Sequence, residues 1–133
     1  MTLRATTRRV GSSLEQQIEI ERHRLAADEP RALGGKDAGP SPQHLLAASL
    51  ASCSAITMEM YARRKGWEVG AIEVDVDYEP AQRGSPTKFE IEVRFPPDLP
   101  AERREKLMQL MAKCPVHRTL EGEVMFEERS TPP

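Results

Sequence analysis

Residues Asp37 to Glu59 read DAGPSPQHLLAASLASCSAITME, and no residue between these two acids carries a formal charge. Charged residues make up 30% of the 133-residue chain, so an uncharged run of this length predicts a buried segment. Ser41 can cap a helix through its hydroxyl group, and Pro42 suits the first helical position because proline has no N–H to satisfy. We therefore expect the central helix of the fold to begin at Pro42.

The end of this helix and its cover can also be predicted. Cations at positions 63 to 65 suit the negative end of the helix dipole, and Gly66 is a natural stop. Mostly apolar residues recur at three- and four-residue steps along one side of the helix, at Leu46, Leu50, Cys53, Thr57 and Met60. Alanines occupy much of the remaining surface, so the helix should be buried nearly all round. One small sheet cannot cover such a helix in so short a chain, which predicts an intimate homodimer.

The composition narrows the class of protein. A net charge of −2 with interspersed charges argues against a nucleic-acid or membrane-surface partner. The uncharged run holds two prolines, a histidine and several serines, which makes it too polar for a membrane span. The first residues lead to no apolar run, so we expect a cytoplasmic protein without a signal peptide. The length predicts one domain over residues 1–133, and we expect no cofactor.

Strands are predicted on both sides of the helix. Residues 3–10 and 17–22 should form a hairpin, followed by an extended segment from 23 to 33. Apolar and charged residues alternate over 72–78 and again over 89–95, which predicts a second, longer hairpin whose outer face can form cross-strand ion pairs. This order favours an α+β fold, with antiparallel sheets packed around the long helix.

The last third of the chain should contain a second helix. Pro100 can open a helix over residues 101–113, and Pro115 should end it. A turn at residues 116–120 then leads to a final strand around 123–128. In this arrangement Cys114 lies at the carboxyl end of the second helix.

Cys53 and Cys114 each lie on the apolar side of their own helix, so both should face the same core. Three interpretations remain open from the residues alone. The cysteines could be small buried hydrophobic residues, as free cysteine often is. They could be a redox pair. They could also bind a metal together with His44 and His117, although no Cys-x-x-Cys motif is present.

If the cysteines are a redox pair, Cys53 is the expected nucleophile. The negative end of the second helix disfavours a thiolate at Cys114. Cys53, in the middle of its helix, gains little from the dipole and needs a nearby cation to lower its pKa. Arg31 is the best-placed candidate along the chain, followed by Arg24 and Arg22.

Three motifs resemble those of the OsmC/Ohr family, named after osmotically inducible protein C and the organic hydroperoxide resistance protein. They are Gly39-Pro40-Ser41-Pro42-Gln43-His44-Leu45-Leu46-Ala47-Ala48, Ala51-Ser52-Cys53 and Lys113-Cys114-Pro115-Val116-His117-Arg118-Thr119-Leu120. Their order and spacing match the family over almost the whole chain. Asp28-Glu29-Pro30 and Gly34-Gly35 are similar to the stand-alone OsmC-like branch.

The resemblance implies an intertwined homodimer with two sites at the subunit interface. It implies that Cys53 attacks the O–O bond of an organic hydroperoxide and becomes a sulfenic acid. Cys114 would then condense with it to a disulfide, and an external dithiol would restore both thiols. A site lined by Leu46, Leu50, Ile56 and Met60 would suit an organic substrate.

Gln43 departs from the family pattern. In the characterised peroxidases an acidic residue at this place pairs with the arginine that holds the thiolate. A neutral amide cannot form that charge-assisted pair, which implies weaker activity or a different geometry. The alternative function is a non-catalytic scaffold of the same fold that binds a small apolar ligand or a protein partner. The expected site therefore consists of Cys53, Cys114, Arg31 and Gln43.

Overall fold

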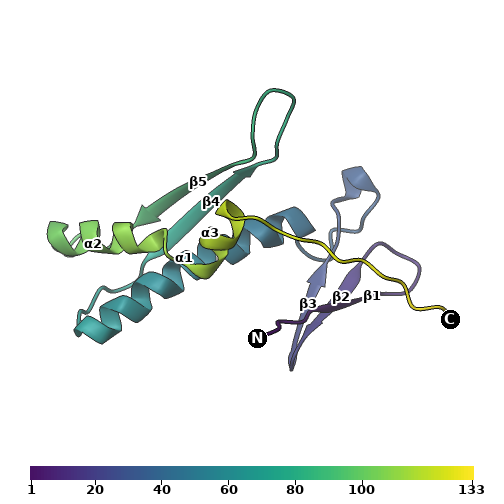
Figure 1. Cartoon of the computed structure of the whole chain (residues 1–133), viewed down its shortest axis with the longest axis horizontal. Helices are drawn as coiled ribbons and strands as arrows, with labels where there is room; N and C mark the ends of the chain where they lie inside the picture. Colours follow the sequence, from purple (N-terminus) through teal and green to yellow (C-terminus); the bar gives the residue numbers. More distant parts are fainter.

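The computed structural model describes residues 1–133, and helix α1 (Pro42–Lys65) is its longest element (Figure 1). The helix begins and ends where predicted. The Ser41 hydroxyl oxygen accepts a hydrogen bond from the backbone N–H of His44 at 3.2 Å, and Pro42 takes the first position. Gly66 ends the helix with a φ of 69°, in the left-handed region that favours glycine.

A two-stranded sheet packs against α1. Strands β4 (Glu73–Glu79) and β5 (Lys88–Arg94) pair antiparallel, with Val74 opposite Val93 and Tyr78 opposite Phe89. Val74 and Val93 pack against the core, whereas the alternate residues are exposed. The predicted second hairpin is confirmed.

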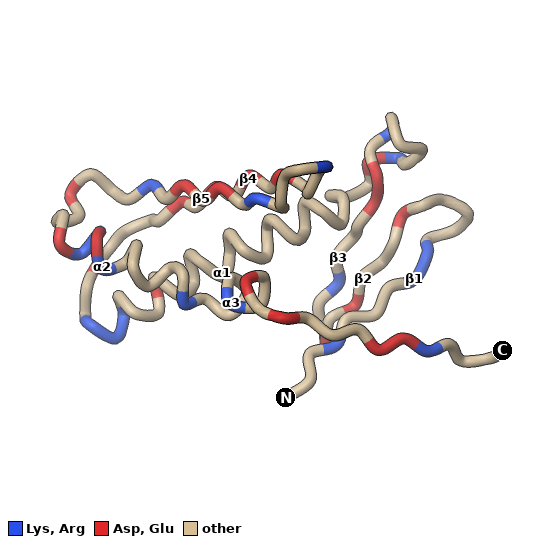
Figure 2. Tube along the Cα trace, turned by 45° about the horizontal axis from the view of Figure 1, so that its top comes forward, with Lys and Arg blue, Asp and Glu red and all other residues tan.

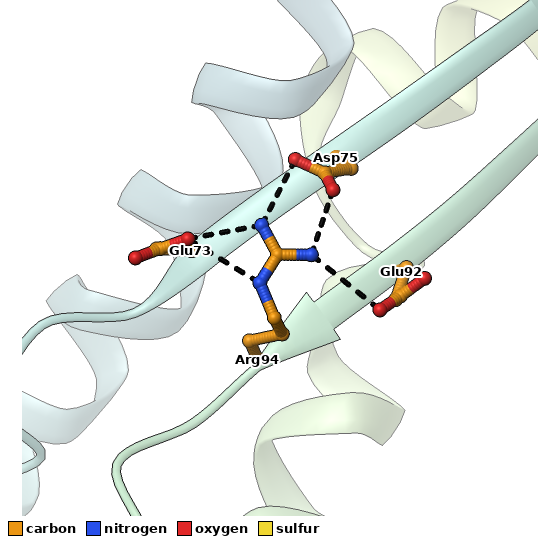
Figure 3. A network of polar contacts seen from close by, with 4 residues as sticks. All are labelled: Glu73, Asp75, Glu92 and Arg94. Atoms are coloured by element: carbon orange, nitrogen blue, oxygen red, sulfur yellow. Dashed lines mark hydrogen bonds and ion pairs between the residues drawn. The ribbon is translucent and has the colours of Figure 1, made fainter.

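The outer face of this hairpin carries the expected cross-strand ion pairs (Figure 3). The Arg94 guanidinium donates to Glu73 at 2.9 Å and to Asp75 at 2.7 Å, both on the neighbouring strand. Glu92 lies on the same side, 3.4 Å from the guanidinium. The hydrogen bond from Arg94 lowers the pKa of Asp75 from its ordinary value. These side chains are exposed, so the pairing fixes strand register more than it stabilises the fold.

Helix α2 (Ala101–Met111) completes the core on the same buried face of α1. Met58 and Ala62 of α1 meet Leu107 of α2, and Val69 and Leu99 complete the buried cluster. Leu107 and Met58 are both 0% exposed. The helix was predicted to continue to residue 113 but ends two residues earlier.

The prediction for the region after α2 is wrong in two respects. Residues 115–121 form helix α3 (Pro115–Glu121) instead of a turn, because Cys114 caps it and Pro115 takes its first position. Residues 123–128 form no strand. A strand needs a neighbour for its backbone groups, and no strand of this chain pairs with that segment.

A second sheet lies to one side of these elements (Figure 1). It consists of β1 (Thr6–Arg9), β2 (Gln16–Ile20) and β3 (His23–Ala27), all antiparallel in that order. The predicted hairpin is thus confirmed, and the predicted extended segment forms its third strand and a short 3₁₀ helix, η1 (Arg31–Leu33). The α+β class with two small antiparallel sheets is as expected.

The chain leaves much of its apolar surface uncovered. Only 10 of 133 residues are buried. The exposed surface is 10745 Å² for a mass of 14.9 kDa. A compact monomer of this mass exposes about 7000 Å². The chain therefore has about half as much surface again as a self-sufficient domain.

Helix α1 contributes to this exposed apolar surface. Its buried face is Leu50, Ser54, Met58 and Ala62, whereas Ile56 is 55% and Met60 56% exposed. The prediction that α1 is buried nearly all round is thus wrong for a single chain. Figure 2 shows that most of α1 is free of charged residues. By length and composition alone the helix could also cross a membrane.

Candidate functional site

Two cysteines from distant parts of the chain lie together where α3 packs against α1. Cys53 is half-buried in the middle of α1, and Cys114, directly before α3, is 0% exposed. The thiol of Cys114 is a hydrogen-bonding neighbour of the Cys53 thiol. The side chain of Thr57 and the backbone N–H of Val116 are the other polar groups that act on Cys53. Both cysteines are free thiols.

The surroundings of Cys53 favour the neutral thiol. Burial raises the pKa of the Cys53 thiol above its ordinary value. The N–H of Val116 lowers that pKa in part, and the Cys114 thiol raises it again. No arginine or lysine is among the groups that act on Cys53. A cation that could stabilise the thiolate is therefore not supplied by the same chain.

Cys114 does not lie in the predicted local environment. It is the N-cap residue of α3 and not the last residue of α2. Its sulfur accepts a hydrogen bond from the backbone N–H of His117 at 3.3 Å. The sulfur thus faces the positive end of a helix, where negative charge is favoured. The dipole argument for Cys53 as the first nucleophile is wrong, and accessibility now distinguishes the two thiols.

An apolar groove of about 630 Å³ borders the cysteine pair. It is lined by Leu46, Leu50, Tyr78, Thr87, Phe89, Ile91, His117, Leu120 and Glu121. Neither cysteine lines the groove, but Leu50 lies one turn before Cys53 and the backbone of His117 contacts Cys114, so the groove lies beside the cysteine pair. Two of the four residues predicted to line the site, Leu46 and Leu50, are in this groove. Ile56 and Met60 are not.

One ionisable pair lies in the groove wall. The Nδ1 atom of His117 is buried and lies against the Glu121 carboxylate, one turn later in α3, with which a protonated imidazole forms an ion pair. The His117 side chain is 25% exposed and that of Glu121 66%. The sequence predicted a turn here and His117 only as a possible metal ligand, so the contact with Glu121, which needs a helix, was missed.

Arg31 lies away from Cys53 in the same chain. It is exposed in η1, within a loop that the buried Asp28 carboxylate organises. This carboxylate accepts hydrogen bonds from the N–H groups of Glu29 at 2.8 Å, and of Lys36 and Ala38 at 3.1 Å. Arg24 and Arg22 are also exposed and do not act on Cys53. If one of these arginines meets Cys53, it does so from another subunit.

Gln43 is exposed in the first turn of α1. It precedes Cys53 by ten positions, which is about 15 Å along a helix axis. Within one chain it is therefore not next to the cysteines. Gly35, which follows Arg31 in the same loop, has no room for a side chain, because a Cβ there would lie 1.9 Å from the Glu29 carbonyl oxygen. The loop conformation that presents Arg31 is thus fixed by the sequence.

No group of three or more His, Cys, Asp and Glu side chains in the structure could hold a metal ion. His44 makes its ring contact with the Ser41 hydroxyl at 2.6 Å, at the start of α1. The proposed ligand set of two cysteines and two histidines is therefore not assembled.

Comparison with known proteins gives one family and several similar folds. The model of the OsmC-like protein family matches residues 34–129. An OsmC-like protein from Mycoplasma pneumoniae has a TM-score of 0.71 and 17% identity, covering 92% of this chain and 89% of that one. No curated protein sequence matches the chain.

Two further similar structures are of proteins named for organic hydroperoxide resistance. OhrB of Bacillus subtilis, an organic hydroperoxide resistance protein, has a TM-score of 0.62 and 23% identity, covering 92% of both chains. An organic hydroperoxide resistance protein OsmC from Legionella pneumophila has a TM-score of 0.61 and 20% identity, covering 92% of this chain and 90% of that one. At these identities the likeness establishes a common fold.

Proposed function

The chain belongs to the OsmC-like protein family, and on this premise we propose that it is a thiol-dependent peroxidase acting on organic hydroperoxides. A single observation carries the proposal: Cys53 and Cys114, far apart in the sequence, are neighbours in the structure. A peroxidatic thiol needs a second thiol within bonding reach to rescue its sulfenic acid from irreversible oxidation. The apolar groove beside them suits the organic part of a hydroperoxide.

Cys53 reacts first in this proposal because it is the accessible thiol. Its thiolate attacks one oxygen of the peroxide, an S–O bond forms and the O–O bond breaks. The thiol of buried Cys114 then attacks the Cys53 sulfenic acid, forming an S–S bond and releasing water. An external dithiol reduces the disulfide and restores both thiols.

We also propose that the working form is a homodimer whose site uses two subunits. The uncovered face of α1 and the excess of exposed surface support a second copy as cover. The raised pKa of Cys53 calls for a cation that its own chain does not supply. The proposed source of this cation is Arg31 of the second copy, which the loop around Asp28 presents. Gln43, in the first turn of α1, stands at the position of the acid that would pair with this arginine.

The cycle is tested by adding an organic hydroperoxide to the reduced protein and mapping disulfides by mass spectrometry. We expect a Cys53–Cys114 disulfide within one chain. Cys53→Ser should abolish peroxide consumption, whereas Cys114→Ser should turn over poorly and accumulate over-oxidised Cys53. Two variants that behave alike would refute this order of attack.

The scaffold alternative keeps one observation in its favour. Gln43 stands where the characterised peroxidases have an acid, so the charge-assisted pair with an arginine is missing. Free thiols that survive excess hydroperoxide in the dimer would favour a scaffold that binds an apolar ligand in the groove.

A further inference from the structure

The His117–Glu121 pair is an ionisable group that the proposed cysteine chemistry leaves unused. Nδ1 of His117 is buried without a hydrogen-bond partner, and the Glu121 carboxylate lies within ion-pair range of it. A protonated imidazole donates from both ring nitrogens. Glu121 occupies Nδ1, which leaves Nε2 as the nitrogen that can donate to another molecule.

The position of His117 connects this pair to the cysteines. Its backbone N–H donates to the Cys114 sulfur at 3.3 Å, and the preceding N–H, of Val116, acts on Cys53. The imidazole itself lines the groove with Leu46 and Leu50. The side chain of His117 thus faces the groove, while its backbone holds the Cys114 sulfur. The organic part of a bound hydroperoxide would occupy the groove.

The reaction requires a proton at this place. When the Cys53 thiolate attacks the terminal oxygen of an alkyl hydroperoxide, sulfur is oxidised and the O–O bond is reduced. The sulfenic acid keeps the hydroperoxide's own O–H proton. The other oxygen leaves with the electron pair as an alkoxide, a strong base that departs slowly unless it is protonated.

We propose that His117 is a catalytic residue, a general acid that protonates the leaving alkoxide from Nε2, and that Glu121 is its positioning residue. The product is then an alcohol, and the neutral imidazole regains its proton from water. This inference rests on the proposed peroxidase function. Among the groove residues Tyr78 is the other possible acid, but a phenol is a much weaker acid than an imidazolium.

The test compares two oxidants that differ in the leaving group. An alkyl hydroperoxide releases an alkoxide, whereas an organic peracid releases a carboxylate, which needs no proton. His117→Gln keeps the backbone N–H that binds Cys114 and removes only the acid. We expect it to slow Cys53 oxidation by tert-butyl hydroperoxide about 10²-fold. Oxidation by peracetic acid should stay near the parent rate.

Two further variants complete the experiment. Glu121→Gln should also lower the ratio of the alkyl hydroperoxide rate to the peracid rate, because it leaves His117 without its acidic partner. The decrease should be smaller than the decrease in His117→Gln. Arg118→Gln, an exposed neighbour in α3, is the matched control and should leave both rates unchanged. A parent-like Glu121→Gln ratio would remove Glu121 from the proposal.

The outcomes separate the inference from the function beneath it. If His117→Gln retains both rates, or loses both equally, the general-acid role is overturned while the peroxidase survives. If the parent protein reacts with neither oxidant, the peroxidase function fails and the inference falls with it. Circular dichroism of each variant checks folding independently of the two rates, and only folded variants are compared.

Discussion

Asp28 shows how one buried carboxylate can fix the loop that presents Arg31. Burial alone raises the pKa of Asp28, but the N–H groups of Ala38, Glu29 and Lys36 and the charge of Lys36 outweigh it, so the pKa is lowered. Because the pKa of Asp28 is lowered in the folded state, its ionised carboxylate stabilises the fold at pH values above the unfolded-state pKa of about 3.9. That stabilisation is lost as the pH falls through the folded-state pKa.

Asp28→Asn should therefore lower the urea midpoint at pH 7, because the amide accepts the three N–H groups poorly and carries no charge. The difference from the parent should shrink near pH 3. Asp37→Asn is the matched control, since Asp37 is exposed in the same loop and has a φ of 57°, which asparagine tolerates. An equal difference at both pH values would contradict the assigned role of the carboxylate.

Cys53 gives a second prediction at this scale. Burial raises the pKa of its thiol, so less thiolate is present at a given pH than in a free cysteine, whose pKa is about 8.5. The rate of Cys53 alkylation by iodoacetamide, measured against pH by peptide mass spectrometry, reports this pKa. In Arg31→Gln the rate should reach half its maximum at a pH above the pKa of free cysteine. The parent protein should reach half its maximum at a lower pH than Arg31→Gln. Identical profiles would exclude Arg31 as the cation.

At the scale of elements, helix α1 has a buried face that stabilises the single chain and an exposed face that should bind a second copy of the chain. Met58 is 0% exposed and Met60 is 56% exposed, although they are two positions apart on the same helix. Their substitution by alanine therefore makes a matched pair. Met58→Ala should cost about 2–5 kcal/mol of unfolding free energy through the cavity that it leaves.

Met60→Ala should instead weaken association, seen as a larger dissociation constant in sedimentation equilibrium. An exposed substitution in a monomer would usually change stability by less than about 0.5 kcal/mol. If Met60→Ala leaves both stability and association unchanged, the open face of α1 is not the interface.

Helix α3 shows where a local signal was available but not used. Ser41-Pro42 was interpreted as a cap and first helical position, and Cys114-Pro115 presents the same arrangement, with the sulfur accepting the N–H of the third helical residue. Cysteine is rarely considered a capping residue, so Pro115 was taken as an end instead of a beginning. Interpreting it as a beginning would have placed His117 and Glu121 one turn apart on a helix.

At the scale of the whole molecule, the excess of exposed surface supports the proposed homodimer. The amino-terminal sheet has three strands and contributes little to the core, and the apolar residues Val124, Met125 and Phe126 lie open after α3. A second copy could cover these surfaces and supply Arg31 to Cys53. A site built in this way can be tested by mixing inactive subunits.

We expect Cys53→Ser and Arg31→Gln each to lose most peroxidase activity as pure dimers. After the two variants are mixed, unfolded and refolded together, heterodimers should recover one active site each. About half of the dimers are mixed at equal amounts of subunits, so activity should approach a quarter of the parent value. No recovery would show that Arg31 does not act between subunits.

The sequence by itself determined the elements whose signals are local. Ser41, Pro42 and Gly66 set the bounds of α1, and alternating residues set β4 and β5, because capping and side-chain periodicity depend on neighbours a few positions away. The order of these strands and helices also predicted the α+β fold class.

Only the tertiary structure decided what depends on distant contacts. It brought Cys53 next to Cys114, the residue that caps α3. It placed His117 and Glu121 in the groove wall and Arg31 away from the thiols of its own chain. It also left one face of α1 open. The physical reason is that packing between segments far apart in the chain fixes these positions, and no local pattern records which segments meet.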